Sequence, residues 1–560
     1  MPQRVGMDNS PGEKRRIKMV KPNELLRRKR LTRRDFLRQG GIAGGALLGG
    51  SLLAACGPTP TPEVVEKVVK ETVVVEKEVE VAKEVLVTPT PVVRGATPEE
   101  RALSGIEALK AAGKIKEGDT FTIMHHSGQR NNIVPALDEW NQLTGLNFQS
   151  VEIGLESDIY VKAMNEAVVR TGDYDIFLTF CNWIGDMAEA GLILDLTEWY
   201  EEYDPEVDHG PNAYVPPLDK FTTLYKGRRY AVGADDDASS VFYRKDLMED
   251  PDEQKAFEDK YGRKLEANTW EEFDQVVEFF DRPDEGMRGA HLYAERYFAY
   301  STWAARFLSK GGLYFDDNMD PGLASEEGVT ALEEMVRLTQ KHMWEDAITG
   351  DWSGAYTRFP EGTVFCTMAW ASLGKWAQDP ETSKIAGKVG YLEVPGTMHN
   401  GTLVRAAPHT VGWSFSVSRY GKAPEAAYCW TQWFTGPTVG LEAIARVATL
   451  DIFRQPWFDE PIMKEAYGEE FMPVLLANTG NCFPDIALRG AAEYLDKLNL
   501  HIQAANAGDE DPEAALKAAA EEWQEITDRL GRAAQAWAWR EERAGYPQPI
   551  QDLWKKLGKV

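Results

Sequence analysis

The chain has 560 residues, and its 89 Asp and Glu outnumber its 62 Lys and Arg to give a formal net charge of −27. Such an acidic chain repels phosphate backbones, so its composition excludes a nucleic-acid-binding protein. The length exceeds what one hydrophobic core supports and instead predicts two lobes of about 200 residues each, with room for a cleft between them.

The first 55 residues have the pattern of an export signal. Arg33 and Arg34 precede an uncharged run of small and apolar residues at 40–55, which is typical of a twin-arginine signal peptide. The run is short and rich in glycine, whereas a membrane-spanning helix needs about 20 strongly apolar residues. Leu-Ala-Ala before Cys56 matches a lipoprotein cleavage site, so we expect lipidation of Cys56, with an uncleaved anchor as the alternative.

This export signal implies specific partners and a location. The expected partners are the twin-arginine translocase, the lipoprotein-processing enzymes and, through the lipid anchor, the outer face of the cytoplasmic membrane. Residues 1–55 hold 13 Lys and Arg against 4 Asp and Glu, so their removal leaves a net charge of −36.

Residues 56–117 are predicted to form a stalk. Gly-Pro-Thr-Pro-Thr-Pro follows Cys56, and a second Thr-Pro repeat occupies residues 88–91, which favours an extended chain. The Val/Glu/Lys tract between them keeps neither a helical nor a strand period throughout. We expect a solvated spacer, with a short helix or coiled coil as the alternative.

From residue 118 the sequence alternates between strand and helix patterns. Short apolar runs and amphipathic segments follow one another at 120–124, 135–140, 148–153, 158–171 and 174–180. This βαβαβ order predicts parallel strands covered by helices. Ligands of such sheets gather beyond the carboxyl ends of the strands, so the loops at 125–132 and 181–184 are candidate ligand contacts.

The later part of the chain continues the α/β pattern. Residues 227–247 contain two apolar strand-like runs with polar residues between, a pattern suited to carrying the chain from one lobe to the other. Thr269 precedes acidic first-turn positions and an apolar face through Phe280, so a helix is expected to begin there. Further strands are expected at 362–368, 389–394 and 411–417, and further helices after 417 and at 512–536.

The cysteines give no sign of a structural metal site. Cys181, Cys366, Cys429 and Cys482 lie far apart and have no zinc-ligand spacing. A disulfide is permitted outside the cytoplasm, but Cys366 and Cys429 stand in apolar runs, where a buried free thiol is the commoner outcome.

Five segments, in order, carry a family resemblance: Asp173–Phe177 with Met187–Thr197, Tyr243–Leu247, Thr269–Phe273, Thr363–Trp370 and Val411–Val417. Together they resemble the family 1 extracellular solute-binding proteins, the sugar-binding components of bacterial ABC importers, similar in fold to maltose-binding protein. The resemblance implies an α/β, type II periplasmic-binding-protein-like fold with two lobes and a hinge. It places the first lobe at 118–236 plus 412–450 and the second lobe at 237–411 plus 451–545. Residues 546–560 are expected to form a C-terminal tail. The chain departs from the family in inserts around 293–303 and 344–358.

A sugar receptor needs aromatic side chains that stack on the C–H faces of the sugar ring, referred to below as plates. It also needs carboxylates or amides that form hydrogen bonds with the sugar hydroxyls. Trp183 and Trp370 follow strand ends and Trp413 stands beside a glycine at an expected lobe crossing, so these are the expected plates, with simple loop packing as the alternative. The other expected ligand contacts are His125, Ser127, Gln129, Asp235, Asp236, Asp237, Ser372, Tyr300 and Trp303.

The polar candidates have other interpretations. Residues 125–132 also suit a helix cap, residues 235–237 also suit a solvated or calcium-binding loop, and Tyr300 and Trp303 suit a core equally well. No metal site is expected, because adjacent histidines diverge and the three aspartates lack the spacing of a calcium loop.

These patterns predict a binding protein rather than an enzyme, a monomer without a cofactor that delivers a carbohydrate to ABC permease subunits. The chief alternative is a surface-anchored glycan hydrolase, which would use the same aromatic residues with a pair of carboxyl groups. With 89 acidic residues, the presence of two carboxylates does not distinguish the two. A surface adhesin predicts repeats or β-sandwich patterning, and the sequence shows neither.

Overall fold

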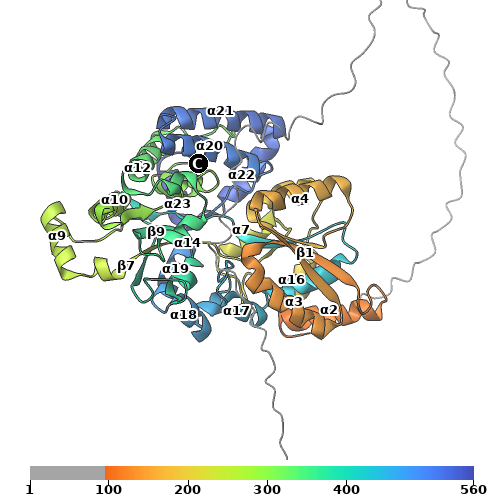
Figure 1. The fold of residues 1–560 in the computed structure, drawn as a ribbon. Coiled ribbons are helices and arrows are strands. Elements are labelled where there is room, and N and C mark those ends of the chain that lie inside the picture. The colour runs from red at the N-terminus through yellow and green to blue at the C-terminus, as the bar shows by residue number, and fades with distance from the viewer. Residues whose placement is uncertain (1–94) are drawn as a thin grey trace, which may run out of the picture. The chain divides into compact units, whose positions relative to one another are not determined.

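The computed structural model describes residues 95–560, which form two lobes, each built on its own sheet (Figure 1). The expected export signal with Arg33 and Arg34, the lipidation site Cys56 and most of the expected stalk lie outside the described residues. The α/β class and the two lobes agree with the sequence-based prediction.

The first lobe is built on a five-stranded sheet in the order β2-β1-β3-β14-β6. Its strands are β1 (Thr120–His126), β2 (Asn147–Ile153), β3 (Ile176–Phe180), β6 (Val232–Gly233) and β14 (Trp413–Val417). β1 is parallel to β2 and β3, whereas β14 runs antiparallel between β3 and β6. The carboxyl ends of the parallel strands therefore meet the start of β14 at one edge, where Trp413 pairs with Phe180.

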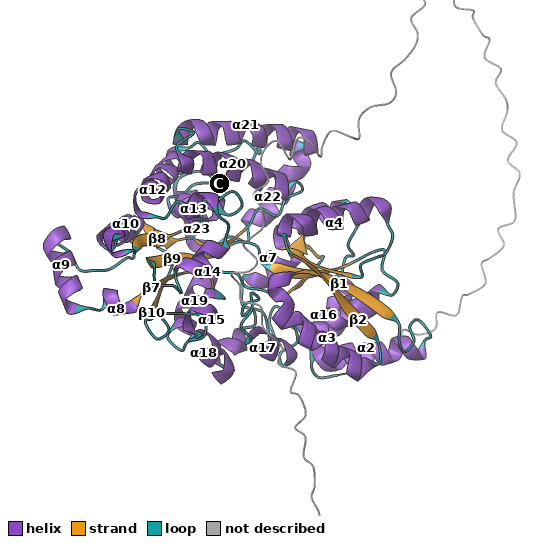
Figure 2. Ribbon diagram, viewed as in Figure 1, coloured by secondary structure: helices purple, strands orange, loops and turns teal. Residues whose placement is uncertain are grey.

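Helices cover both faces of this sheet, with α4 on one side and α2, α3 and α16 on the other (Figure 2). The helices of the lobe are α2 (Pro98–Ala111), α3 (Arg130–Thr144), α4 (Glu156–Val169), α5 (Ile184–Glu189), α6 (Thr197–Tyr203), α7 (Leu218–Thr223), α16 (Pro424–Phe434) and α17 (Val439–Ile444). Short 3₁₀ turns, η2 (Ser127–Gln129) and η3 (Cys181–Trp183), follow β1 and β3 directly. Trp430 and Trp433 of α16 are buried in the core.

The second lobe is built on a four-stranded sheet in the order β10-β7-β9-β8. Its strands are β7 (Ser239–Arg244), β8 (Arg288–His291), β9 (Val364–Trp370) and β10 (Val389–Leu392). Every residue of β9 is buried, as the apolar run there predicts. Short pairs complete the strands: β4 (Leu224–Tyr225) with β5 (Arg228–Arg229), β11 (Gly396–His399) with β12 (Thr402–Arg405), and β13 (Ala407–His409) with β15 (Cys482–Pro484).

The helices of the second lobe include a stack formed by α20, α21 and α22 (Figure 2). They are α8 (Lys245–Met248), α9 (Pro251–Tyr261), α10 (Trp270–Phe279), α11 (Ala299–Ser309), α12 (Glu326–His342), α13 (Asp346–Thr349), α14 (Ser353–Arg358), α15 (Leu373–Gln378), α18 (Pro461–Tyr467), α19 (Phe471–Gly480), α20 (Ala491–Ala507), α21 (Pro512–Leu530), α22 (Arg532–Arg543) and α23 (Gln548–Lys556). α10 begins as predicted, because Thr269 and Glu272 form a capping box.

The chain passes between the two sheets at residues 234–238, at residues 410–412 and again between α17 and α18. Asp237 and Val411 adopt positive φ angles of 47° and 81°, which are rare for residues with a side chain. The backbone N–H of Gly412 donates to Oδ2 of Asp237 over 3.0 Å and joins two of these passages. Backbone held in such conformations is concentrated at functional sites.

The structure differs from the sequence-based expectation at both ends of the body. Residues 98–111, expected to belong to the stalk, form α2, and Gly105 lies so close to α6 that a Cβ there would be 2.5 Å from the Tyr203 hydroxyl. Residues 548–556, expected to be a tail, form α23, whose Trp554 is fully buried. The helix expected at 512–536 is interrupted by Gly531. In each case apolar contacts with distant parts of the chain decide the outcome.

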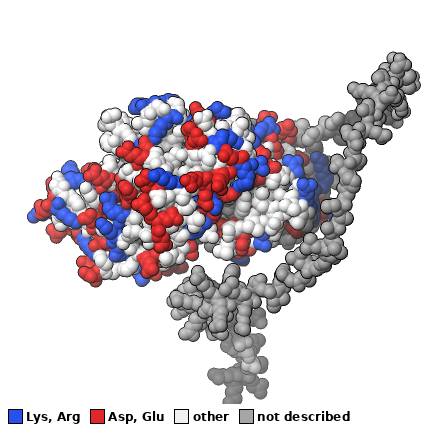
Figure 3. All heavy atoms as spheres, turned by 90° about the horizontal axis from the view of Figure 1, so that it is seen from above, with Lys and Arg blue, Asp and Glu red and all other residues white. Residues whose placement is uncertain are grey.

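Charges on the surface follow the acidic composition. Acidic side chains gather across the middle of the face seen from above, interspersed with basic ones (Figure 3). Among residues 95–560, each helix is too short or too polar to cross a lipid bilayer.

Candidate functional site

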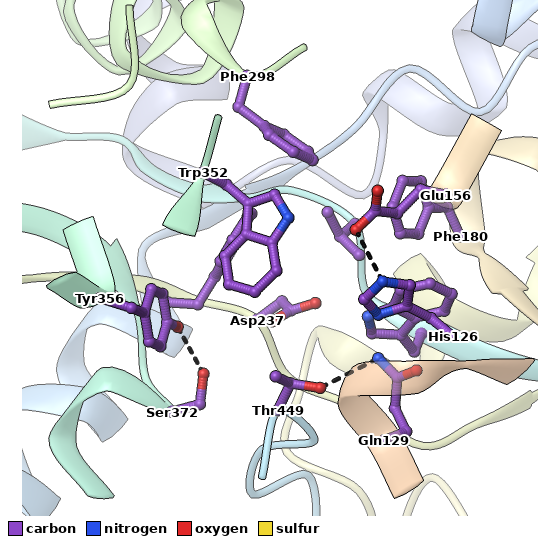
Figure 4. Close-up of a pocket in the computed structure, with 13 residues that line it drawn as sticks. His126, Gln129, Glu156, Phe180, Asp237, Phe298, Trp352, Tyr356, Ser372 and Thr449 are labelled. Atoms are coloured by element: carbon purple, nitrogen blue, oxygen red, sulfur yellow. Dashed lines mark hydrogen bonds and ion pairs between the residues drawn. The ribbon is translucent and has the colours of Figure 1, made fainter. Parts of the chain in front are cut away.

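A cleft of about 930 Å³ lies between the two lobes at the edge where β1, β3 and β14 meet. A narrower inner pocket continues from it and shares His126, Glu156, Phe180, Phe298, Trp352 and Val411 with it. The inner pocket is also lined by Gln129, Asp237, Tyr356, Trp370, Ser372, Trp413 and Thr449 (Figure 4). Its volume of about 30 Å³ holds about two water molecules. In this arrangement the inner pocket is therefore too small for a whole sugar.

Aromatic rings form the walls of the inner pocket. In the second lobe the ring of Trp370, at the end of β9, lies 5.1 Å from Phe298 and 5.9 Å from Trp352, both edge to face. In the first lobe Phe180, at the end of β3, lies 4.5 Å from Trp413 at the start of β14. The two lobes thus present aromatic faces to a common space, which suits the apolar face of a sugar or polyol.

His126 and Glu156 form a polar pair at the pocket wall. His126 is the last residue of β1, and Glu156 is the first residue of α4. Nδ1 of His126 accepts a hydrogen bond from the backbone N–H of Gly128, so the ring proton is on Nε2, which lies 3.4 Å from Oε1 of Glu156. This contact joins the end of β1 to the start of α4 at the pocket wall.

Two further hydrogen bonds fix polar groups from opposite sides of the pocket (Figure 4). Nε2 of Gln129 donates to the hydroxyl of Thr449 over 3.1 Å. The hydroxyl oxygens of Tyr356 and Ser372 lie 2.6 Å apart. The amide oxygen of Gln129 is buried and has no hydrogen-bond partner among the described residues.

A cluster of buried carboxylates lies at the floor of the inner pocket. Carboxylate oxygens of Asp235, Asp237 and Asp451 lie within 4.8 Å of one another, and Asp237 reaches the pocket surface. Burial raises the pKa of all three above the ordinary value, and neighbouring carboxylates raise the pKa of Asp235 and Asp237 further, whereas Lys375 lowers that of Asp451. Nζ of Lys375 lies 3.7 Å from Asp451, and burial lowers the pKa of this lysine.

The outer cleft has a second polar group around Asp485. Its carboxylate accepts hydrogen bonds from the Tyr300 hydroxyl, from Nδ2 of Asn182 over 3.0 Å and from the backbone of Val411 over 3.1 Å. Burial raises the pKa of Asp485 to about 6. Trp183 lines the same cleft beside Tyr160, with ring centroids 5.3 Å apart.

The structure brings together most of the side chains expected to contact a ligand. The inner pocket gathers Gln129, Asp237, Trp370, Ser372 and Trp413, and the outer cleft gathers Ser127, Trp183 and Tyr300. Contact of these residues with a solute stays a prediction.

Four expected contacts lie elsewhere. His125 is buried beneath the cleft and its Nδ1 bonds to the carbonyl of His126, because alternate residues of a strand face opposite sides. Trp303 stacks on Phe307 at 4.4 Å in the core of the second lobe. Asp235 and Asp236 are buried beneath the floor of the pocket, where Asp236 accepts from the Thr479 hydroxyl over 2.7 Å.

His126 belongs to the candidate loop at 125–132, although it was not singled out. Several other lining residues were not predicted, namely Glu156, Phe180, Phe298, Trp352, Tyr356 and Thr449. Trp352 and Tyr356 lie within the insert at 344–358, so the departure from the family pattern marked part of the site. Glu156 follows the carboxyl end of β2, the same position as the two loops that were predicted. Thr449 left no signal, because only the tertiary structure brings it to Gln129.

Comparisons with known proteins agree with this architecture. An erythritol/L-threitol-binding protein of Mycolicibacterium smegmatis is 23% identical over 361 residues, 61% of this chain and 72% of the relative. Two other curated relatives match over stretches that span 37% and 38% of their own length.

Solved structures share the fold. A solute-binding protein of Agrobacterium radiobacter K84 in complex with ribitol has a TM-score of 0.64 and 22% identity, covering 73% of this chain and 99% of that one. The maltose-bound MalE3 of T. maritima has a TM-score of 0.62 and 23% identity, covering 73% and 100%. Residues 149–440, more than half of the chain, match the sequence pattern of one family. This chain belongs to that family, the bacterial extracellular solute-binding proteins.

Proposed function

We propose that this protein is the substrate-binding component of an ABC importer and that it captures a sugar, oligosaccharide or polyol between its lobes. The observation that carries the proposal is the inner pocket, in which aromatic rings from both lobes flank hydrogen-bonding side chains. Similar proteins hold ribitol and maltose, and another is named for erythritol and L-threitol. Their likeness in fold and sequence supports the same class of ligand here.

The geometry supports capture by closure of the lobes. Trp413 belongs to the first lobe and Trp370 to the second, so a solute that contacts both stabilises the closed arrangement over the open one. The passages at 234–238 and 410–412 supply the hinge, because short segments that connect two packed lobes absorb such motion. The closed form then presents both lobes together to the permease.

We further propose that the mature protein is a monomer tethered to the outer face of the cytoplasmic membrane by a lipid on Cys56. The support is the sequence Leu-Ala-Ala-Cys after a twin-arginine pattern, followed by proline-rich residues. A tether of this kind keeps the binding protein close to its permease and raises its effective concentration there.

The proposal predicts binding without chemistry. The exported protein would be incubated with a panel of polyols, hexoses and maltooligosaccharides, and its thermal unfolding temperature and the products would be measured. A rise in Tm with recovery of the intact solute is expected, because a ligand that binds only the folded state stabilises it. Cleaved glycan would contradict the proposal and support the hydrolase alternative.

A further inference from the structure

The inner pocket is lined by two carboxyl groups and by no Lys or Arg among the described residues. We propose that the solute bears a protonated amine that binds in the inner pocket beside Asp237 and Glu156, so that the protein selects an amine-bearing sugar or polyol. This proposal rests on the proposed function and specifies the ligand of the same site.

The first support is the sign of the charges that line the pocket. Glu156 and Asp237 line the inner pocket, and none of the described residues that line it is Lys or Arg. In the outer cleft the guanidinium of Arg296 is bonded to both the carboxylate and the backbone carbonyl of Asp496, each over 2.6 Å. Arg296 is thus already paired, and the other charged residues that line this cleft are acidic, with Glu493 in an ion pair with Arg529.

The second support is that no Lys or Arg among residues 95–560 forms an ion pair with Glu156. Its Oε1 lies 3.4 Å from Nε2 of His126, whose Nδ1 accepts a hydrogen bond from the backbone N–H of Gly128. A cation in the pocket would complete the pairing of this carboxylate.

The third support is the imbalance at the floor of the pocket. Asp235, Asp237 and Asp451 form one buried cluster, and Lys375 is the lysine that faces it. Nζ of Lys375 donates to the carbonyls of Ile444 and Leu450, which fixes its position. Three buried carboxyl groups thus face one lysine, and burial disfavours the ionised form of each. A cation beside Asp237 would supply the charged partner that lets its carboxyl group ionise.

The fourth support is the kind of polar atom that remains free. Nε2 of Gln129 donates to Thr449, and its buried amide oxygen is an acceptor without a partner among the described residues. The side chain of Gln129 is only 1% exposed, so water does not satisfy this oxygen from the surface. An ammonium group offers three donors, whereas a hydroxyl offers one. Carboxylates and an amide oxygen together therefore suit an amine.

The aromatic walls are compatible with an organic cation. The rings of Trp352, Trp370 and Trp413 border the same pocket, and indole faces attract cations by about 0.5–2 kcal/mol each. Rings supply no oxygen ligands for a metal ion, and Lys375 would repel one bound at the carboxylate cluster. An anionic solute, such as a sugar phosphate or a uronic acid, would be repelled by the carboxylates, because no cation in the inner pocket would compensate its charge.

Calorimetric titration of the exported protein with matched probes tests the proposal. The probes are glucosamine against glucose, N-acetylglucosamine and glucuronate, and glucamine against sorbitol. The amine-bearing member of each set is expected to bind at least about tenfold more tightly, because it gains a charge-assisted hydrogen bond. Asp237→Asn should abolish this preference. Since Asp237 also holds Gly412, Glu156→Gln serves as a second variant and should reduce the preference.

Glu525→Gln, an exposed position on α21, changes the net charge equally and should leave the preference unchanged. Equal or tighter binding of the neutral members, or no binding of the amine-bearing ones, would overturn the proposal. Mass spectrometry of the solute that co-purifies from the native source separates the two proposals. An intact neutral sugar would overturn this one and leave the proposed function standing, whereas cleavage of the panel glycans would contradict the proposed function itself.

Discussion

The backbone N–H of Asp451 donates a hydrogen bond of 2.6 Å to Oδ1 of Asp235 and joins two of the passages between the lobes. Oδ2 of Asp451 accepts from the backbone N–H of Ser372 over 2.7 Å, and the Ser372 hydroxyl contacts Tyr356 in the pocket wall. The hinge and the binding pocket therefore share one hydrogen-bond network. A solute that moves Tyr356 acts directly on the segments that bend.

Replacing Trp352 with alanine should weaken solute binding about tenfold or more and lower the stability by less than about 1.5 kcal/mol. Trp352 is only half-buried and borders both the inner pocket and the outer cleft, so its loss removes a contact surface without opening the core. Calorimetric titration and urea unfolding measure the two effects.

Trp303→Ala is the matched control, since Trp303 is fully buried and stacks on Phe307. This substitution should lower the free energy of unfolding by about 3–5 kcal/mol, while the protein that remains folded binds the solute normally. An affinity of the Trp352→Ala variant equal to that of the wild type would show that Trp352 does not contact the solute.

Replacing Lys375 with methionine should lower the free energy of unfolding by about 3–5 kcal/mol, because it leaves the buried carboxylates without their lysine. Asp451→Asn in the same chain should recover part of the loss, which a double-mutant cycle measures. Lys245→Met is the control, since Lys245 pairs with Glu470 at the surface. This substitution should lower the free energy of unfolding by less than about 1 kcal/mol. Equal losses in the two lysine variants would contradict the argument.

A chain that begins at residue 118 should be less stable than one that begins at residue 95, by about 3–6 kcal/mol. The shorter chain lacks α2, whose Ile106 and Leu109 are buried, and each such side chain contributes about 1.5–3 kcal/mol. Urea unfolding of the two chains provides the measurement. Equal free energies of unfolding in the two chains would show that residues 98–111 belong to the stalk and not to the folded body.

The stability should fall as the pH rises from about 4 to 8. Burial raises the pKa of Glu295, Asp485 and Glu542 to about 7, 6 and 8. Above about pH 4 the folded state therefore holds protons that the unfolded state has released, and this stability is lost as the pH rises through the folded pKa values. Burial lowers the pKa of His291 and His409 to about 4 and 3, so these two groups lose stability as the pH falls from about 6.5 towards 4, which offsets only part of the change from the three carboxyl groups.

Glu542→Gln tests the alkaline side of this dependence. Its carboxyl group is buried, and Oε1 has no hydrogen-bond partner among the described residues. The variant should flatten the fall in unfolding free energy between pH 6 and pH 8, measured by urea titration at each pH. A slope identical to that of the wild type would show that Glu542 does not hold its proton.

Thiol reagents should label no cysteine of the folded body and four after denaturation. Cys181, Cys366, Cys429 and Cys482 are free and buried, and burial raises the pKa of each thiol, which suppresses the reactive thiolate. Mass spectrometry after alkylation with and without denaturant counts the labels. A label that requires prior reduction would reveal a disulfide instead.

The sequence by itself determined the local elements and the class of fold. The βαβαβ order predicted the parallel strands β1, β2 and β3, and Thr269 with Glu272 predicted the start of α10. Strand period and helix capping depend on residues a few positions apart, so they can be read from the chain alone. The same rules placed Trp370 and Trp413 at strand ends beside the cleft.

Only the tertiary structure decided which side chains share the pocket. Gln129 and Thr449 are 320 positions apart, and Trp352 reaches Trp370 from an insert whose path no local rule predicts. Whether a strand residue faces the cleft or the core also depends on the neighbouring elements, which is why His126 lines the pocket and His125 does not. Packing of distant segments sets these contacts, since the apolar surface they bury together outweighs any local preference.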